Sequence, residues 1–182
     1  MNEFCIPNLT ARRFEEIDFD QVLTEQRRFL CLDLDNTLIT QTGETFSPKV
    51  LAKLKEIRES GRVEDICLVS NVIFPGPRLT RLRRLAKVLD ISNVVPCFFF
   101  TRKPKPAPYP QAMKLMKAKP EESIMVGDQI FTDIVGGNKL GFYTIWLETM
   151  SKDHWTTRLT GRRKKEILVR KTLKERGLLP SS

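Results

Sequence analysis

Two acidic residues, Asp33 and Asp35, directly follow the apolar run 29–32. If that run is a strand ending at Asp33, both carboxylates point the same way beyond the sheet edge, because strand side chains alternate with a period of two. Two neighbouring carboxylates repel each other unless a cation lies between them or one keeps a proton. The pair is therefore consistent with a Mg²⁺-dependent phosphoryl-transfer site with Asp33 as nucleophile. The alternative is a plain Asp-Asn turn after a strand.

Polar residues also end other strand-like runs. They are Ser70-Asn71 at the end of 65–70, Lys103 after 96–100, and Asp128 after 123–127. In a parallel sheet, ligands bind in the crevice outside the carboxyl ends of the strands. We therefore expect these side chains to converge with Asp33, although each alone could be an ordinary turn, a surface lysine or a helix cap.

Phosphoryl transfer needs a nucleophile, a proton carrier and positive charge near the phosphoryl oxygens. With Asp33 attacking phosphorus, Asp35 can protonate the leaving oxygen and then activate water. Ser70 and Asn71 offer neutral donors to the phosphoryl group. Thr37 is placed to fix the geometry of the turn beside the substrate.

Positive charge and metal ligands come from later in the chain. Lys103 supplies fixed charge, with Lys105 as a rival for that role. Asp128 joins Asp33 and Asp35 in a predicted Mg²⁺ site of hard oxygen ligands, a backbone carbonyl among them. Asp133, in the first turn of a predicted helix, is expected to hold metal-bound water or orient Lys103.

Strand-like and helix-like segments alternate along the chain, which predicts right-handed βαβ units and a mostly parallel, five-stranded sheet in a three-layer α/β/α fold. The predicted strands are 28–33, 65–70, 96–100, 123–127 and 142–147. The predicted helices are 48–60, 78–90, 109–118 and 132–140. Only about 32 residues separate Thr37 from Ser70, and a helix and a strand fill them, so no cap domain is expected.

The ordered motifs resemble those of the haloacid dehalogenase (HAD) superfamily phosphatases, subfamily IIIA. The matching segments are Asp33-Leu-Asp-Asn-Thr37, Val69-Ser70-Asn71, Lys103-Pro104 and Gly127-Asp128-Gln129-Ile-Phe-Thr132-Asp133. The stretch through Gly136-Gly137-Asn138 and the basic end after Thr157 are similar to the narrower phosphatidylglycerophosphate phosphatase-like branch. The resemblance implies a Rossmann-like HAD fold, Mg²⁺, an aspartyl-phosphate intermediate and a phospholipid headgroup as substrate.

The chain carries a formal net charge of +9, unevenly distributed. Residues 150–182 hold ten Lys or Arg against three acids. We predict a phosphatase domain over 1–150 and a basic helical segment over 151–182, packed on the same domain or lying on anionic lipid. Nucleic acid is the competing polyanion, but no nucleic-acid motif is recognised. The sequence carries no signal for an oligomeric state.

Composition narrows the class of protein further. The 41% hydrophobic and 29% charged residues are typical of a globular chain. We see no membrane-spanning run and no secretory signal, so we expect a cytoplasmic location. The basic C-terminal end adds the expectation of peripheral contact with a membrane. The four cysteines lie far apart and are predicted to be core thiols. His154 is the single histidine, which argues against a Ser-His-Asp site.

Two other functions remain open. One is a capless HAD phosphatase acting on a nucleic-acid end, a phosphoprotein or a soluble phosphate ester. The other is a non-catalytic basic binding protein on a HAD scaffold. The second would be expected to lack one of the motif residues Asp33, Asp35, Lys103 or Asp128, and all four are present.

Overall fold

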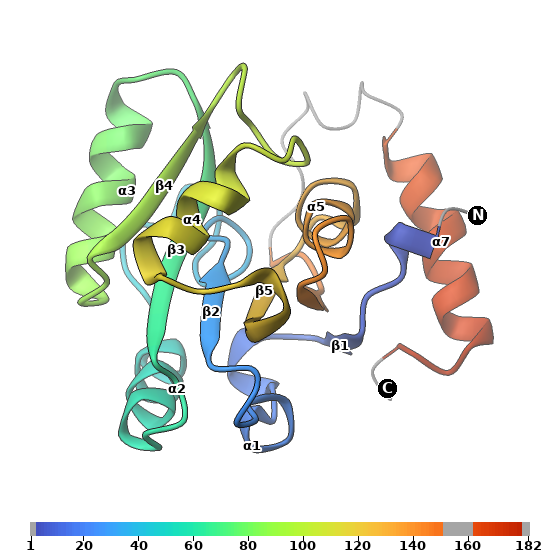
Figure 1. Ribbon diagram of the computed structural model, residues 1–182. Helices are drawn as coiled ribbons and strands as arrows, with labels where there is room; N and C mark the ends of the chain where they lie inside the picture. Colours follow the sequence, from blue (N-terminus) through green and yellow to red (C-terminus); the bar gives the residue numbers. More distant parts are fainter. Residues whose placement is uncertain (1–2, 151–161, 180–182) are drawn as a thin grey trace.

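A single parallel sheet organises the described part of the chain. The computed structural model describes residues 3–150 and 162–179. Within these residues the sheet has six strands in the order β1-β6-β5-β2-β3-β4 (Figure 1). The strands are β1 (Leu9–Ala11), β2 (Phe29–Leu32), β3 (Asp65–Ile73), β4 (Asn93–Phe98), β5 (Ser123–Gly127) and β6 (Tyr143–Leu147).

The α/β fold is confirmed, but the prediction of five strands is wrong by one. The sixth strand, β1, comes from the N-terminal segment and pairs with β6 through Leu9 and Ile145. Three residues are too few to show a strand period, so only the tertiary pairing reveals it. The strand predicted over 96–100 is β4, which runs from Asn93 to Phe98. Pro96 lies within it, which a sheet tolerates because β4 is an edge strand.

Proline and serine signals mark the helix starts. Ser47 Oγ accepts a hydrogen bond from the Val50 amide at 3.2 Å, and three of the helices open on a proline, at Pro48, Pro77 and Pro108. The described α-helices are α1 (Phe19–Val22), α2 (Pro48–Glu59), α3 (Pro77–Val88), α4 (Pro108–Met116), α5 (Val135–Asn138) and α7 (Arg162–Glu175). Short 3₁₀ turns are η1 (Glu3–Cys5), η2 (Phe14–Glu16) and η3 (Pro120–Glu122).

The helix expected over 132–140 takes a different form. Residues Ile130–Ile134 form a π-helical turn, η4, and only the short α5 follows. Gly136 and Gly137 weaken the helix, yet the packing requires them. A Cβ at Gly136 would collide with the Tyr109 hydroxyl, and one at Gly137 would lie 2.8 Å from Thr144 Cγ2.

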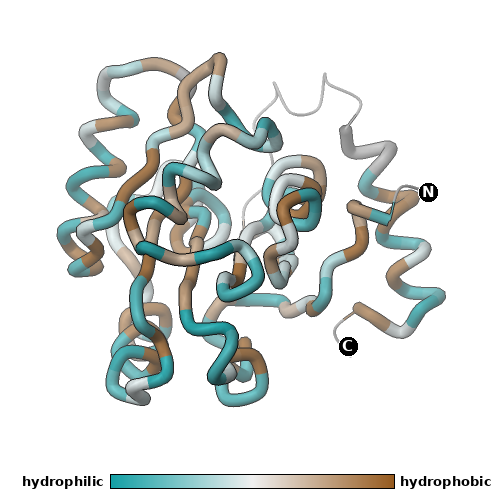
Figure 2. The backbone as a smooth tube through the Cα atoms, in the orientation of Figure 1, coloured by the Kyte–Doolittle hydropathy of each residue, from teal (hydrophilic) through white to brown (hydrophobic). Residues whose placement is uncertain are grey.

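The two faces of the sheet belong to different hydrophobic clusters, as the period of two demands. Leu30 and Leu32 pack with α2 and α3 on one face, whereas Phe29 and Cys31 pack with α4 on the other. Apolar residues accordingly concentrate along the central strands, while the outer helices alternate between hydrophobic and hydrophilic positions (Figure 2). The four cysteines are buried and free.

The C-terminal helix α7 lies beside the N-terminal segment (Figure 1). Its residues Val169 and Leu173 are buried in a cluster with Trp146 and Ile134, and the Arg170 guanidinium stacks 4.8 Å from the Trp146 ring centroid. Residues 151–161, including His154, lie outside the described residues. Among the described helices, none has both the length and the apolar composition needed to cross a membrane.

The loops at the carboxyl edge of the sheet are short. The β2–α2 connection runs from Asp33 to Ser47, and the β3–α3 connection from Phe74 to Gly76. Neither of these described connections has room for a cap domain. The carboxyl edge is therefore open above the ends of β2, β3 and β5.

Candidate active site

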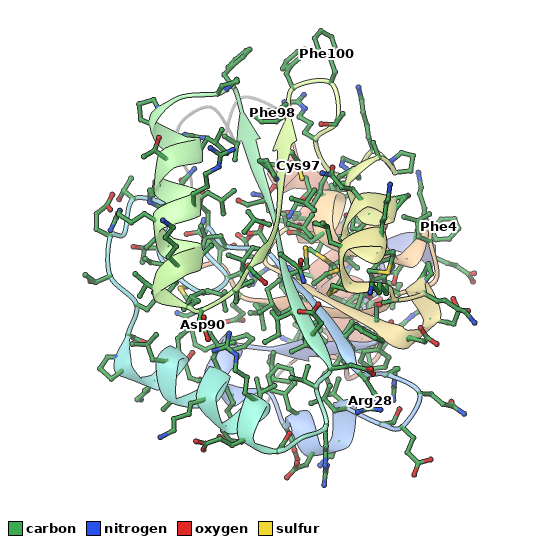
Figure 3. All side chains as sticks on the ribbon, turned by 60° about the vertical axis from the view of Figure 1, so that its left-hand side comes forward. Phe4, Arg28, Asp90, Cys97, Phe98 and Phe100 are labelled. Carbon is green, nitrogen blue, oxygen red and sulfur yellow. The ribbon has the colours of Figure 1, made fainter. Side chains whose placement is uncertain are left out.

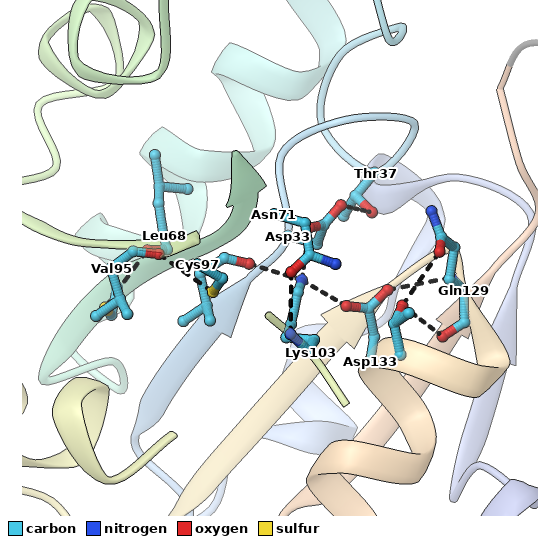
Figure 4. A network of polar contacts seen from close by, with 12 residues as sticks. Asp33, Thr37, Leu68, Asn71, Val95, Cys97, Lys103, Gln129 and Asp133 are labelled. Carbon is cyan, nitrogen blue, oxygen red and sulfur yellow. Dashed lines mark hydrogen bonds and ion pairs between the residues drawn. The ribbon is translucent and has the colours of Figure 1, made fainter. Parts of the chain in front are cut away.

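Asp33 is fixed at the end of the central strand β2. Its backbone amide donates to Val126 O of β5 at 2.9 Å. The chain then turns through Asn36, whose φ of 62° is tolerated by asparagine better than by most residues. This turn brings Thr37 back, and its hydroxyl donates to Asp33 Oδ2 at 3.4 Å (Figure 4). Thr37 is fully buried, so it reaches the site through Asp33.

Lys103 lies at the centre of the polar cluster. Its Nζ lies 2.6 Å from Asp33 Oδ1 and 2.5 Å from Asp133 Oδ1, and it donates to Val69 O at 2.7 Å (Figure 4). The residue is only 2% exposed. The rival Lys105 instead donates to Phe100 O at 3.0 Å on the outer loop. The structure thus brings Lys103, and not Lys105, to the side chain of Asp33.

The first turn after β5 holds Asp133 in place. Asp133 Oδ2 accepts from the Gln129 amide at 3.1 Å, while its other oxygen binds Lys103. Its side chain lies so close to Gly127 that a Cβ there would stand 2.5 Å from Asp133 Cβ. Gly127 is therefore required for the close approach of Asp133 to the strand end.

Three buried carboxylates form a group with the chemistry of a divalent-cation site. Asp33, Asp128 and Asp133 offer oxygens that all lie within 4.8 Å of one another. Asp128 Oδ1 is buried without a hydrogen-bond partner among the described residues. A buried carboxylate oxygen normally has a partner, and clustered oxygen ligands are those that Mg²⁺ prefers. The residues present therefore fit Mg²⁺, although the Asp35 carboxylate is not part of this group.

Crowding and burial perturb these groups. Burial raises the pKa of Asp33 to about 7, with Lys103 opposing the shift and Asp133 adding to it. Burial, reinforced by the charges of Asp33 and Asp133, raises the pKa of Asp128 well above its usual range. Burial alone would lower the pKa of Lys103, but Asp133 and Asp33 outweigh it and raise that pKa. The raised pKa values of Asp33 and Asp128 favour their protonated forms, and a bound cation would favour their ionised forms instead.

Asp35 has a partner that the sequence did not reveal. Its Oδ1 lies 2.7 Å from Arg81 Nη1, and Arg81 Nε also donates to Gly43 O at 3.0 Å. Arg81 lies on α3, and the sequence suggested only a basic stretch there. The sequence could not identify Asp35 as the partner of Arg81, because the two residues are 46 positions apart.

Ser70 and Asn71 lie at the carboxyl end of β3. Ser70 is buried, and both residues border a cleft of about 570 Å³. Asn71 Oδ1 accepts a hydrogen bond from the Lys103 amide at 3.0 Å, so this side chain ties the end of β3 to the Lys103 loop. The cleft also contacts Asp33, Asp35, Lys103 and Asp133. The predicted motif residues thus come together around one cleft, with Thr37 and Asp128 buried behind its wall.

A parallel α/β sheet with Asp33, Ser70, Lys103 and Asp128 at its carboxyl edge defines a HAD phosphatase, a phosphoric monoester hydrolase. Residues 1–150 match the family described as "Mitochondrial PGP phosphatase", and the chain belongs to this family.

Curated relatives agree with that class. The chain is 26% identical over 178 residues to "Probable phosphatase YqeG" of Bacillus subtilis (strain 168), spanning 97% of this chain and 96% of that protein. It is 24% identical over 148 residues to "Phosphatidylglycerophosphatase GEP4, mitochondrial" of Saccharomyces cerevisiae, spanning 79% of this chain and 77% of that protein. Some other matched phosphatases are longer, and the chain spans as little as 45% of one of them.

A solved structure shows the same fold. A protein from Listeria monocytogenes serotype 4b aligns over 70% of this chain and 84% of its own, with a TM-score of 0.57 and 16% identity.

Proposed function

We propose that this protein is a Mg²⁺-dependent phosphatidylglycerophosphate phosphatase that works through an aspartyl-phosphate on Asp33. The observation that carries the mechanism is the group of three buried carboxylates at the cleft, with Lys103 bound to two of them. The substrate is supported by the family match and by the similarity to the yeast phosphatidylglycerophosphatase.

The cation would be held by Asp33 and Asp128, with Asp133 nearby, and the Asp35 backbone as a further oxygen ligand. When bound, Mg²⁺ neutralises phosphoryl oxygens and permits the buried carboxylates to ionise together. The carboxylate oxygen of Asp128 that has no hydrogen-bond partner among the described residues supports this assignment.

In the first step, an Asp33 carboxylate oxygen attacks phosphorus and the ester P–O bond breaks. Asp35 gives its proton to the leaving oxygen. In the second step, Asp35 takes a proton from water, which attacks the aspartyl-phosphate and releases inorganic phosphate and the Asp33 carboxylate. Lys103 compensates charge on the phosphoryl group, while Ser70 and Asn71 lie where they can donate to its oxygens.

The open cleft favours a phosphate presented by something larger than the site. A capless edge encloses a small metabolite poorly, but it can receive a headgroup that projects from a lipid surface. We also propose a cytoplasmic location with peripheral membrane contact. Fractionation of cell extracts at low and high salt tests the location, since release by salt is expected of a peripheral protein.

Phosphate release from a panel of substrates tests the function. The panel contains phosphatidylglycerophosphate in mixed micelles, a 5′-phosphorylated oligonucleotide, a phosphopeptide and soluble sugar phosphates, each with Mg²⁺ and with EDTA. We expect the lipid to have the highest kcat/KM, and both EDTA and Asp33→Asn to abolish turnover. A higher kcat/KM for another substrate would overturn the lipid assignment. Full turnover by Asp33→Asn would overturn the mechanism.

A further inference from the structure

Three phenylalanines lie exposed on the two loops that border the cleft. Phe74 follows β3, while Phe99 and Phe100 follow β4, and they are 65%, 44% and 81% exposed. Because β3 and β4 pair up to Ile73 and Phe98, the two loops emerge side by side. The Phe74 and Phe99 rings stack with centroids 6.1 Å apart, and Phe100 meets Phe99 edge-on at 5.2 Å. Phe100 projects outward at the tip of its loop (Figure 3).

This aromatic rim, defined as Phe74, Phe99 and Phe100, is not explained by the core. Its members lie in none of the buried clusters of the described residues. Exposed aromatic residues gathered at one place mark an interaction site more often than scattered ones do. The rim therefore leaves apolar surface exposed to water, and a bound partner would cover that surface.

Basic side chains accompany the rim. The Arg102 guanidinium lies 5.1 Å from the Phe99 ring centroid, and both Arg102 and Arg78 border the cleft. Lys105 Nζ donates to the Phe100 carbonyl. The sequence contains no acidic residue from 91 to 120, nor from 66 to 89. The rim and the cleft mouth are thus apolar and positive together.

Position and charge together select the occupant. Phe74 borders the cleft itself, so whatever covers the rim also stands over the cleft mouth. A partner bound there would block the cleft to other substrates. Catalysis therefore remains possible only if this partner itself carries the phosphate that is hydrolysed. Aromatic rings at the headgroup level beside cations that face anionic lipid are the pattern of interfacial binding. Base stacking needs an open ring face, and the central ring of the rim, Phe99, is already in contact with Phe74 and Arg102.

We propose that the aromatic rim, with Arg78, Arg102 and Lys105, docks the protein on an anionic phospholipid bilayer and holds the cleft over the headgroups. The proposal rests on the proposed function for its choice of substrate. It locates membrane contact at the mouth of the cleft. In α7, Val169 and Leu173 are buried in the protein and are not available to a bilayer.

Vesicle co-sedimentation of the full chain tests this docking without using catalysis. The probes are phosphatidylcholine vesicles with and without phosphatidylglycerol. Phe4→Ala is the matched control, because Phe4 is a phenylalanine of the same 44% exposure as Phe99 and lies away from the rim (Figure 3). We expect Phe100→Ala to weaken binding to the anionic vesicles roughly tenfold, as expected when one inserted aromatic side chain is lost. Phe4→Ala should bind like the parent chain.

A fluorescence variant locates the contact directly. In Phe100→Trp, emission should shift to shorter wavelength when anionic vesicles are added, and Phe4→Trp should show no such shift. Equal vesicle binding by Phe100→Ala and Phe4→Ala, or no shift in Phe100→Trp, would overturn the docking. Vesicle-independent change in oligomeric state on Phe100→Ala would instead identify the rim as a contact between copies and also overturn it.

Two activity measurements separate this proposal from the proposed function. The ratio of hydrolysis of vesicle-embedded phosphatidylglycerophosphate to that of soluble p-nitrophenyl phosphate should fall about tenfold in Phe100→Ala, in line with the loss of binding. If the parent chain hydrolyses no phosphatidylglycerophosphate yet binds vesicles through Phe100, the substrate is wrong and the docking stands. If it hydrolyses the lipid in micelles but Phe100→Ala changes neither binding nor the ratio, the docking is wrong.

Discussion

Replacing Lys103 by methionine probes the centre of the site most severely. Lys103→Met keeps much of the side-chain length but removes the charge and the contacts with Asp33, Asp133 and the Val69 carbonyl. Two buried carboxylates then lose their shared partner. Removing one partner of a buried ion pair costs about 3–5 kcal/mol. For a chain of this size, about 2–4 °C per kcal/mol gives a fall in Tm of roughly 6–20 °C.

Thermal unfolding followed by circular dichroism in EDTA measures this effect, with Lys105→Met as the matched control on the same loop. Lys105 donates to the Phe100 carbonyl on the outer loop, away from the buried carboxylates, so its replacement should change Tm little. The loss from Lys103→Met should shrink as the pH falls toward 7. Lys103 holds down the pKa of Asp33, which is about 7 in the parent chain, so without Lys103 that pKa rises further and a proton replaces the lost positive charge. Equal Tm for the two variants at pH 8 would refute the importance of this ion cluster.

Three further predictions concern the same site. Gly127→Ala places a Cβ 2.5 Å from Asp133 Cβ, so we expect a loss of about 1–3 kcal/mol in the free energy of unfolding, measured with denaturant, and reduced turnover. In EDTA, the folded state binds more protons than the unfolded state between pH 4 and 7, because the pKa of Asp33 rises from 3.8 to about 7. The free energy of unfolding should therefore fall with rising pH across that window, with a slope of at most about 1.4 kcal/mol per pH unit for this group, and Mg²⁺ should oppose the fall. Arg81→Met frees the Asp35 carboxylate and should lower kcat by about 10–100-fold, whereas Arg84→Met, which removes a contact to Glu44 and none to Asp35, should not. An unchanged kcat for Arg81→Met would contradict the role of its ion pair with Asp35. A free energy of unfolding that does not vary between pH 4 and 7 would contradict the raised pKa of Asp33. Parent-like stability of Gly127→Ala would contradict the close approach of Asp133 to Gly127.

The sequence predicted which polar residues gather at the carboxyl edge of the sheet better than it predicted the outer strands. Asp33, Ser70, Lys103 and Asp128 each follow a strongly apolar run, and parallel strands bring such positions to one edge. The choice between Lys103 and Lys105 needed the structure, because both lie in one proline-rich loop and only the fold directs one Nζ inward.

Features that depend on tertiary pairing could not be predicted. The strand β1 has three residues and forms only against β6. Arg81 finds Asp35 because α3 packs beside the loop after β2, which no local pattern encodes. The aromatic rim depends on where a strand ends. The sequence pattern predicts a strand through residue 100, whereas β4 ends at Phe98 and leaves Phe99 and Phe100 on the loop.

Trapping the covalent intermediate tests the central claim most directly. The parent chain is mixed with substrate and Mg²⁺, quenched in acid within one turnover, and digested for mass spectrometry. We predict a phosphoryl group on the peptide that contains Asp33, absent in EDTA and absent in Asp33→Asn. Phosphate release by the parent chain with no phosphoryl group on Asp33, or with the group on another residue, would contradict the assignment of Asp33 as nucleophile.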